Sequence, residues 1–263
     1  MTGPLPLPPF QPWLPFLTLL KREVLRFLRV SFQTLLAPVI TASLYLFVFG
    51  ATLGQRISVL EGFSYAQFVI PGLILMGIIN NSFANTSTSL FMSRYLGNIV
   101  DLLVAPITAP QLILAYTLAA MLRGMLVGAV ITLIALGFAP LPWVYPGLGL
   151  VMALLSSFLF AQFGLIAAIH ANTFDALSMF TNFLLLPLIY FGGVFYPVSI
   201  LPPFWEGLSR CNPLFYLIDG FRFALLGSGD NPFWLSFGIS AAMAGGLFLW
   251  AALLIATGYR LRN

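Results

Sequence analysis

Charged residues are scarce in this chain. Lysine and arginine number 11 and aspartate and glutamate number 7 among 263 residues, so 7% of the chain is charged while 60% is hydrophobic. A soluble domain carries about 25% charged residues, which cover the surface that faces water. The scarcity therefore excludes a soluble enzyme and a nucleic-acid-binding module.

Cysteine and lysine each occur once. Cys211 alone allows neither an intrachain disulfide nor a cysteine-rich metal site. A P-loop needs the pattern G-x-x-x-x-G-K-[ST], and Lys21 follows Leu20, so the chain cannot hydrolyse ATP through that motif. The G-x-S-x-G and H-E-x-x-H motifs of hydrolases are also missing. We therefore expect no catalytic site, no metal site and no cofactor on this chain.

Long apolar runs are abundant. Each is long enough for the helix of about 20 residues that crosses a hydrocarbon core of ~30 Å. They predict an all-α membrane protein with six transmembrane helices, at about residues 32–53, 68–91, 110–137, 146–169, 177–196 and 233–258. Seven lysines and arginines flank these spans on one side and three on the other, which places both termini in the cytoplasm.

The N-terminal segment divides into two parts. Residues 1–15 contain six prolines and predict a disordered leader. Residues 16–30 predict a basic amphipathic helix in the plane of the lipid headgroups, although they fit the basic flank of the first span equally well. Its apolar side would carry Leu17, Leu20, Val24, Phe27 and Leu28, and its basic side Lys21, Arg22, Arg26 and Arg29.

Two links between the spans are too apolar for solvated loops. The inner link, residues 92–109, predicts a short amphipathic helix that ends at Pro106. The outer link, residues 197–232, is interrupted by prolines and predicts short helices that dip into the outer leaflet.

Two polar features stand out inside the predicted spans. Asn80, Asn81 and Asn85 belong to a polar run in the second span, which either bonds to other helices or lines a wet path. Arg123 is the one charge within the six predicted spans. It either marks a functional site or snorkels to the inner headgroups, and the second interpretation is favoured.

Acidic residues all fall outside the six predicted spans, which argues against ion-coupled transport. His170 and Asp175 lie near each other in the sequence, but they offer too few ligands for a metal ion. We expect that segment to form a turn that caps the fifth span.

Several blocks together resemble the membrane subunit of a bacterial type 2 ABC exporter, of the drug, lipid and nodulation-factor branch. They are PGLILMG from Pro71, NNSFANTS from Asn80, RYLGNIVDLLVAPITAPQ from Arg94, LPLIYFGGVFYPVSILPPFW from Leu186 and NPLFYLIDGFRFALLG from Asn212. The resemblance implies one six-helix domain over residues 16–263, in a homodimer that binds two copies of a separate P-loop ATPase. ATP and Mg²⁺ would bind to that partner.

The resemblance also implies roles for individual residues. The inner link becomes a coupling helix over residues 93–105, with contacts to the ATPase from Arg94, Tyr95, Gly97, Asn98, Asp101 and Leu102. The pathway candidates are Asn80, Asn81, Asn85, Phe180, Phe183 and Tyr190. The outer-gate candidates are Phe204, Trp205, Asn212, Pro213, Tyr216, Asp219 and Arg222.

The function expected is a permease of the bacterial inner membrane that exports an amphipathic or hydrophobic cargo by alternating access, in contact with the lipid bilayer and not with nucleic acid. A permease for lipid-linked polysaccharide is the alternative within the class. An ATP-independent channel or membrane scaffold is the alternative outside it. Removing the Arg94 and Asp101 side chains is expected to uncouple ATP hydrolysis from transport without unfolding the protein.

Overall fold

Helices make up the regular structure of the described chain. A computed structural model describes residues 13–29, 31–53 and 62–260, and these residues contain no β-strand. Most of the predicted leader, residues 1–12, lies outside them. The α-helices are α1 (Trp13–Arg29), α2 (Ser31–Tyr45), α3 (Tyr65–Tyr95), α4 (Ile99–Val104), α5 (Ala109–Ala135), α6 (Pro146–His170), α7 (Phe174–Met179), α8 (Leu186–Phe191), α9 (Pro203–Arg210), α10 (Pro213–Leu226) and α11 (Phe233–Ala256). The π-helical segments are η1 (Leu46–Leu53) and η2 (Phe180–Leu185), and η3 (Val198–Ile200) is a 3₁₀ turn.

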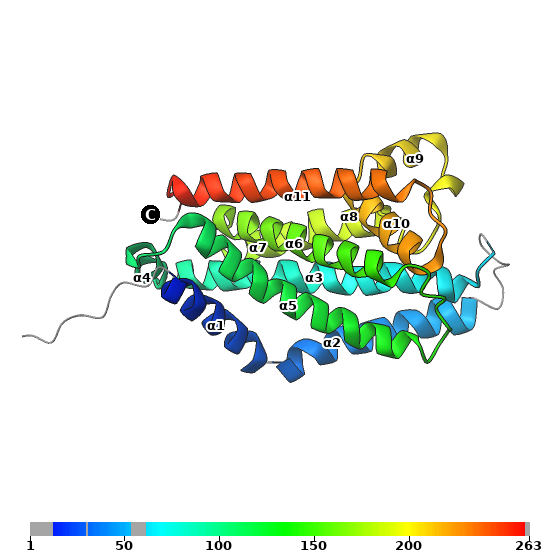
Figure 1. The fold of residues 1–263 in the computed structure, drawn as a ribbon, viewed down its shortest axis with the longest axis horizontal. Helices are drawn as coiled ribbons and strands as arrows, with labels where there is room; N and C mark the ends of the chain where they lie inside the picture. The colour runs from blue at the N-terminus through cyan, green and yellow to red at the C-terminus, as the bar shows by residue number, and fades with distance from the viewer. Residues whose placement is uncertain (1–12, 30, 54–61, 261–263) are drawn as a thin grey trace, which may run out of the picture.

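Within the described residues, five helical stretches are long and apolar enough to cross a membrane. They are α3, α5, α6, the continuous stretch Phe174–Phe191 and α11. A shorter apolar stretch, Leu35–Phe49, falls in the segment predicted as the first span. The two ends of the bundle differ, because α4, the start of α1 and the end of α11 lie at one end, and α9 and α10 at the other (Figure 1).

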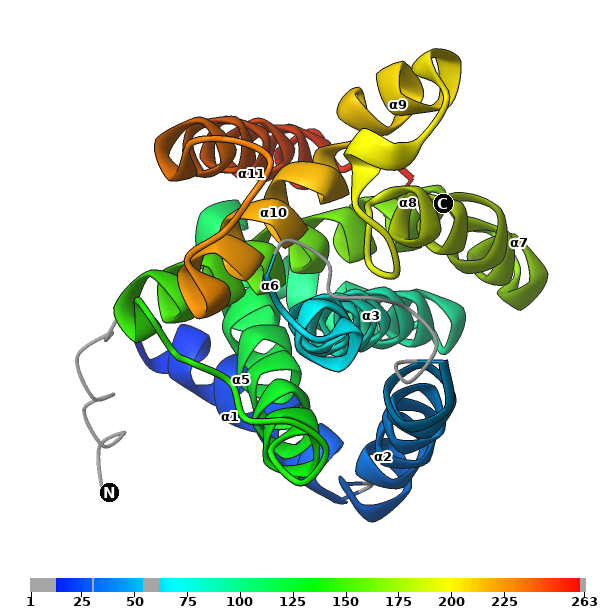
Figure 2. The same ribbon diagram turned by 90° about the vertical axis from the view of Figure 1, so that its right-hand side faces the viewer.

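The long helix α3 is the centre of the bundle. It packs against α5, α6, α10 and η1, and in Figure 2 it also lies between α2 and α7. Its residues are buried around most of its circumference, including the polar ones of its second half. Close packing depends on small residues, since a Cβ at Gly164 would overlap the Thr86 hydroxyl and one at Gly124 the Ser82 hydroxyl.

The ends of α3 extend beyond the predicted limits of 68–91. Ser64 caps the helix at its start, where its hydroxyl accepts from the Gln67 N–H and the Gln67 side chain accepts from the Ser64 N–H. At the other end the helix continues through Arg94 to Tyr95. The predicted coupling helix of residues 93–105 is therefore shorter, and α4 contains only six residues.

The fifth apolar segment starts and ends earlier than the predicted 177–196. Pro187 has no N–H for the helical ladder, and just before it the Leu186 N–H bonds to the Thr181 carbonyl, five residues back, in a π turn. The helix ends at Phe191 because Gly193 adopts a positive φ of 78°. The predicted end at 196 was wrong, since the GG pair that follows Phe191 is a stop signal.

The outer link differs from a set of shallow helices. α9 is exposed, with Phe204 74% exposed. α10 is instead a core element that packs against α3, α6 and α11, with Leu217 and Ile218 buried.

Candidate transport seam and its two ends

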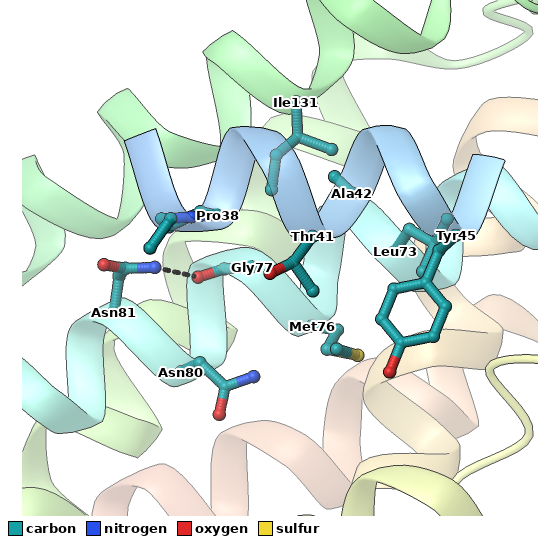
Figure 3. Close-up of a pocket in the computed structure, with 11 residues that line it drawn as sticks. Pro38, Thr41, Ala42, Tyr45, Leu73, Met76, Gly77, Asn80, Asn81 and Ile131 are labelled. Atoms are coloured by element: carbon teal, nitrogen blue, oxygen red, sulfur yellow. Dashed lines mark hydrogen bonds between the residues drawn. The ribbon is translucent and has the colours of Figure 1, made fainter. Parts of the chain in front are cut away.

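A cavity of about 220 Å³ lies between α2 and α3. Asn80 and Asn81 of α3 and Thr41 of α2 give it polar groups, and Met76 and Tyr45 add apolar surface. In Figure 3 the side chains of Asn80, Thr41, Met76 and Tyr45 converge on the space between the two helices. Amides on an otherwise apolar wall give the cavity an amphipathic lining. We call this cavity the seam.

An aromatic cluster lies at the outer end of the seam. The Tyr45 hydroxyl lies 3.3 Å from the Tyr190 hydroxyl, which joins α2 to α8. The Phe195 ring lies 5.4 Å from the Tyr45 ring and 5.9 Å from the Tyr190 ring, between centroids. Tyr190 was predicted in the pathway, whereas Tyr45 was not, because a tyrosine within an apolar span carries no signal of its own.

A polar junction lies at the inner end of the seam. Asn81 donates to the Gly77 carbonyl over 3.1 Å, and its side-chain oxygen accepts from Arg123 over 3.3 Å. The Asn85 side-chain oxygen accepts from Arg26 of α1 over 3.0 Å and from Arg123 over 3.4 Å. The Arg123 guanidinium is thus bonded across to α3, and its position at the inner headgroups stays a prediction.

Glu23 of α1 is the acidic member of this junction, and it is 1% exposed. Arg26 and Arg22 lie 3.1 and 3.2 Å from its carboxylate, and Ser89 of α3 donates to it over 2.5 Å. Sequence reasoning missed Glu23, although it shares a helical stripe with the buried Leu19 and Phe27. We call Glu23, Arg26, Asn81, Asn85, Ser89 and Arg123 the junction.

The stripe of α1 that faces the protein includes a charged residue. The helix begins at Trp13, three residues before the predicted start. Phe27 is buried as expected, but Leu17 and Leu28 of the predicted apolar side are 54% and 43% exposed. α1 packs on α5, and its buried stripe includes the Glu23 carboxylate. That its apolar side faces lipid in the headgroup plane stays a prediction.

The remaining pathway candidates are not gathered in the seam. Phe180 is half-buried and Phe183 is 76% exposed, and neither lines the cavity. Both belong to η2, the π-helical part of the fifth apolar stretch.

The inner link presents some predicted contacts and hides others. Arg94 donates to the carbonyls of Ala168, Ile169 and Ala171 and so caps the C-terminal end of α6. Tyr95 is 65% exposed, and Gly97 takes a positive φ of 77° at the turn into α4.

Within and beside α4, Asn98 and Asp101 are exposed and Leu102 is 8% exposed. Leu102 therefore packs inward, whereas Asp101 is available to a partner.

The outer block is held by buried polar bonds. Asp219 accepts from the N–H groups of Asp230 and Asn231 and from the Ser236 hydroxyl, which fixes the turn between α10 and α11. Arg222 donates to the Gly193 carbonyl over 2.7 Å, and its guanidinium lies 3.9 Å from the centroid of the Phe68 ring. Both residues are buried and tie helices together.

The other gate candidates differ in burial, and Asn212 is buried. Asn212 donates to the Leu188 carbonyl and caps α10, where Pro213 is the first residue and Tyr216 is half-buried. Phe204 and Trp205 are exposed on α9, and Trp205 stacks on Phe191.

Metal ligation finds no support in the part of the chain that the structure describes. No group of three or more His, Cys, Asp and Glu side chains there could hold a metal ion. The His170 ring contacts the Ile166 carbonyl. Thr173, the residue before Phe174, caps the start of α7. Cys211 is exposed.

Comparison with known proteins decides the family. The model of the ABC-2 type transporter family matches residues 15–226. The chain belongs to that family. It is 42% identical over 254 residues to inner membrane transport permease YadH of Escherichia coli strain K12, which covers 95% of this chain and 98% of that protein. Nodulation protein J of Rhizobium meliloti strain 1021 is 24% identical over 209 residues, 79% of this chain and 80% of that protein.

The family supplies the broad function. The chain is an ABC permease of the inner membrane, a transport subunit rather than an enzyme, and it works with a partner ATPase. The bonds that join α1 to α3 are then bonds between the N-terminal helix and a long apolar helix of the permease.

The burial of Glu23 predicts a specific loss of stability. Glu23→Ala leaves Arg22 and Arg26 without their carboxylate and Ser89 without its acceptor, and we expect a cost of about 1–3 kcal/mol. Thermal unfolding of the purified permease in detergent measures this cost. The matched control is Glu206→Ala, which removes an exposed i,i+4 pair with Arg210 and should cost about 0–1 kcal/mol. Equal losses in the two variants would contradict the account of the junction.

Proposed function

We propose that this permease exports an amphipathic or hydrophobic cargo, a drug or a lipid-like molecule, through the seam by alternating access. Two copies of the chain, each with six spans, would form the pathway together with two copies of the ATPase. The first span would be α2 with η1, and the fifth α7 with η2 and α8. The observation that carries the proposal is the seam itself, with amides on an apolar wall and an aromatic contact at its outer end.

Two π-helical segments support the proposal that the first and fifth apolar segments move during transport. η1 continues the first apolar segment and η2 interrupts the fifth. π turns are frequent at functional sites, because they leave the helical ladder with fewer regular bonds at one point. A change at η1 and η2 would part Tyr45 from Tyr190 and open the outer end of the seam.

The fifth apolar stretch also supports pairing of two permease chains. Met179 and Phe183 are 59% and 76% exposed in a single copy. A second copy that packs against this face would bury them and would close the seam on that side. The bilayer would cover the outward faces of α5, α6 and α11.

The inner link supports an ATPase contact at α4. Tyr95, Leu96, Val100 and Val104 are 65%, 59%, 58% and 79% exposed, so an apolar surface faces away from the bundle at this end. Asp101 adds a charge to the same short helix. Arg94, near the end of α3, does not belong to this surface. It donates to the last carbonyls of α6 and so holds the end of α3 against α6.

The coupling proposal is tested with Tyr95→Ala/Asp101→Ala, which changes two exposed side chains. We expect cargo-stimulated ATP hydrolysis by the reconstituted permease and ATPase to fall about tenfold, roughly 1.4 kcal/mol of coupling, with an unchanged melting temperature. Asp175→Ala, an exposed acid of α7, is the control and should keep full stimulation.

Arg94→Ala is expected to lower the melting temperature as well, because it frees three carbonyls of the α6 terminus. Normal coupled transport in the Tyr95→Ala/Asp101→Ala variant would contradict the proposal that α4 contacts the ATPase. A reconstituted permease that transports without any ATPase would contradict the exporter proposal altogether.

The cargo path is tested with Asn80→Leu, which removes an amide from the seam wall. In proteoliposomes that contain the permease and its ATPase, a fluorescent short-chain phospholipid and a lipophilic dye serve as cargo probes. Because the variant loses one polar contact to the cargo, we expect the probes to stimulate ATP hydrolysis five- to tenfold less, a loss of about 1–1.4 kcal/mol. ATP hydrolysis without a probe should be unchanged. Asn172→Leu makes the same change at an exposed turn outside the seam and should behave as wild type.

A further inference from the structure

A second and larger cavity of about 630 Å³ lies at the inner end of the permease, between α1 and the last turns of α3. Ligand pockets in proteins measure about 300–1,000 Å³. Arg22, Arg26 and Arg29 line the cavity from the α1 side, and Ser93 and Asn98 from the α3 side. It is separate from the seam, because the two cavities share no lining residue.

Positive charge dominates the second cavity. Its three arginines face one carboxylate, that of Glu23, which already bonds to Arg22, Arg26 and Ser89. Arg29 is exposed, and no salt bridge involves it among residues 13–29, 31–53 and 62–260. The cavity therefore has cationic groups left over for an anion.

An uncharged polar residue, Asn98, also lines the cavity, next to α4. Asn98 precedes α4, and its side chain makes no capping bond to that helix. Because the amide carries two N–H donors, it can donate to an anion held by the arginines. An occupant would then touch both α1 and the start of α4.

Apolar side chains complete the lining. Leu25, Met92 and Leu96 line the same cavity and are 42%, 38% and 59% exposed. A small inorganic anion has no use for such surface, whereas an acyl chain or glycerol backbone next to an anionic headgroup would cover it.

The position of the cavity agrees with a lipid. α1, α4 and the end of α11 lie together at one end of the bundle (Figure 1), and the positive charge of that end indicates the cytoplasmic side. Basic pockets beside membrane helices on this side bind the headgroups of anionic lipids. A helix with a basic face and an apolar edge lies at headgroup depth.

We propose that this cavity binds the phosphate headgroup of an anionic phospholipid of the inner leaflet, with Arg22 and Arg29 as its principal cationic contacts and Leu25, Met92 and Leu96 against its glycerol and acyl part. Bound there, the lipid links the interfacial helix α1 to the segment that leads into α4. The site does not depend on the identity of the exported cargo.

The experiment measures lipid binding to the purified permease in an uncharged detergent, by native mass spectrometry. The probes are a short-chain phosphatidylglycerol, a phosphatidylcholine of the same chain length and inorganic phosphate. We expect phosphatidylglycerol to bind at least about tenfold more tightly than phosphatidylcholine, and this preference to decrease with added salt.

Variants identify the site. Arg22→Gln/Arg29→Gln should raise the Kd for phosphatidylglycerol about 10- to 30-fold, as expected for two cations near a lipid headgroup. Arg22→Lys/Arg29→Lys keeps both charges and should restore binding to within about threefold. Arg210→Gln, an exposed arginine at the opposite end, is the matched control and should bind as wild type. Melting temperatures without lipid verify that each variant is folded.

Three results would overturn the proposal. One is equal binding of phosphatidylglycerol and phosphatidylcholine, and another is wild-type affinity in the folded glutamine double variant. The third is that inorganic phosphate binds at this cavity as tightly as phosphatidylglycerol does. That result would assign the cavity to a free phosphate ion instead of a lipid.

Discussion

The polar half of α3 must find partners inside an apolar bundle, and this constraint governs the rest of the structure. Amides and hydroxyls that are buried in hydrocarbon without a partner cost free energy. Ser82 therefore bonds to Ser157, and Thr86 to the Ala161 carbonyl, which fixes α6 against α3. On another face the Asn81 and Asn85 oxygens accept from Arg123, which ties α5 to the same helix.

On the proposed function, these bonds would separate a fixed part of the permease from a part that moves. Polar contacts join α3 to α1, α5 and α6, and a bond between Gln162 and Thr117 joins α6 to α5, so we treat these helices as one block. α2 and α8 meet instead through a hydroxyl pair at 3.3 Å, and the Phe195 ring, which follows α8, lies beside both tyrosines. Since π-helical turns also lie in the first and fifth apolar segments, we expect motion around the seam rather than within the block.

Much of this architecture is readable in the sequence, because a membrane span needs only length and hydropathy. The all-α class and five of the long apolar stretches were predicted to within a few residues, except where Gly193 ends the fifth predicted span early and where α3 continues to Tyr95. The first predicted span, residues 32–53, contains only the shorter apolar stretch Leu35–Phe49. The side-chain partners were not predicted. Arg123 and Arg94 looked like a snorkelling residue and a docking contact, yet both bond to neighbouring helices. Such pairings depend on helix rotation and tilt, which hydropathy does not record. Glu23 was hidden for the same reason.

The central claim is that the seam opens while the α3, α5 and α6 block stays rigid, and electron paramagnetic resonance distances test it directly. In a Cys211→Ser background, spin labels replace Tyr45 and Tyr190 across the seam, and in a second protein Leu118 and Leu154, exposed residues of α5 and α6. The account predicts that ATP with the partner ATPase shifts the distance between positions 45 and 190 by several ångströms, on the order of a hinge or shear motion, and leaves that between positions 118 and 154 unchanged. A shift between 118 and 154 with no change between 45 and 190 would contradict it.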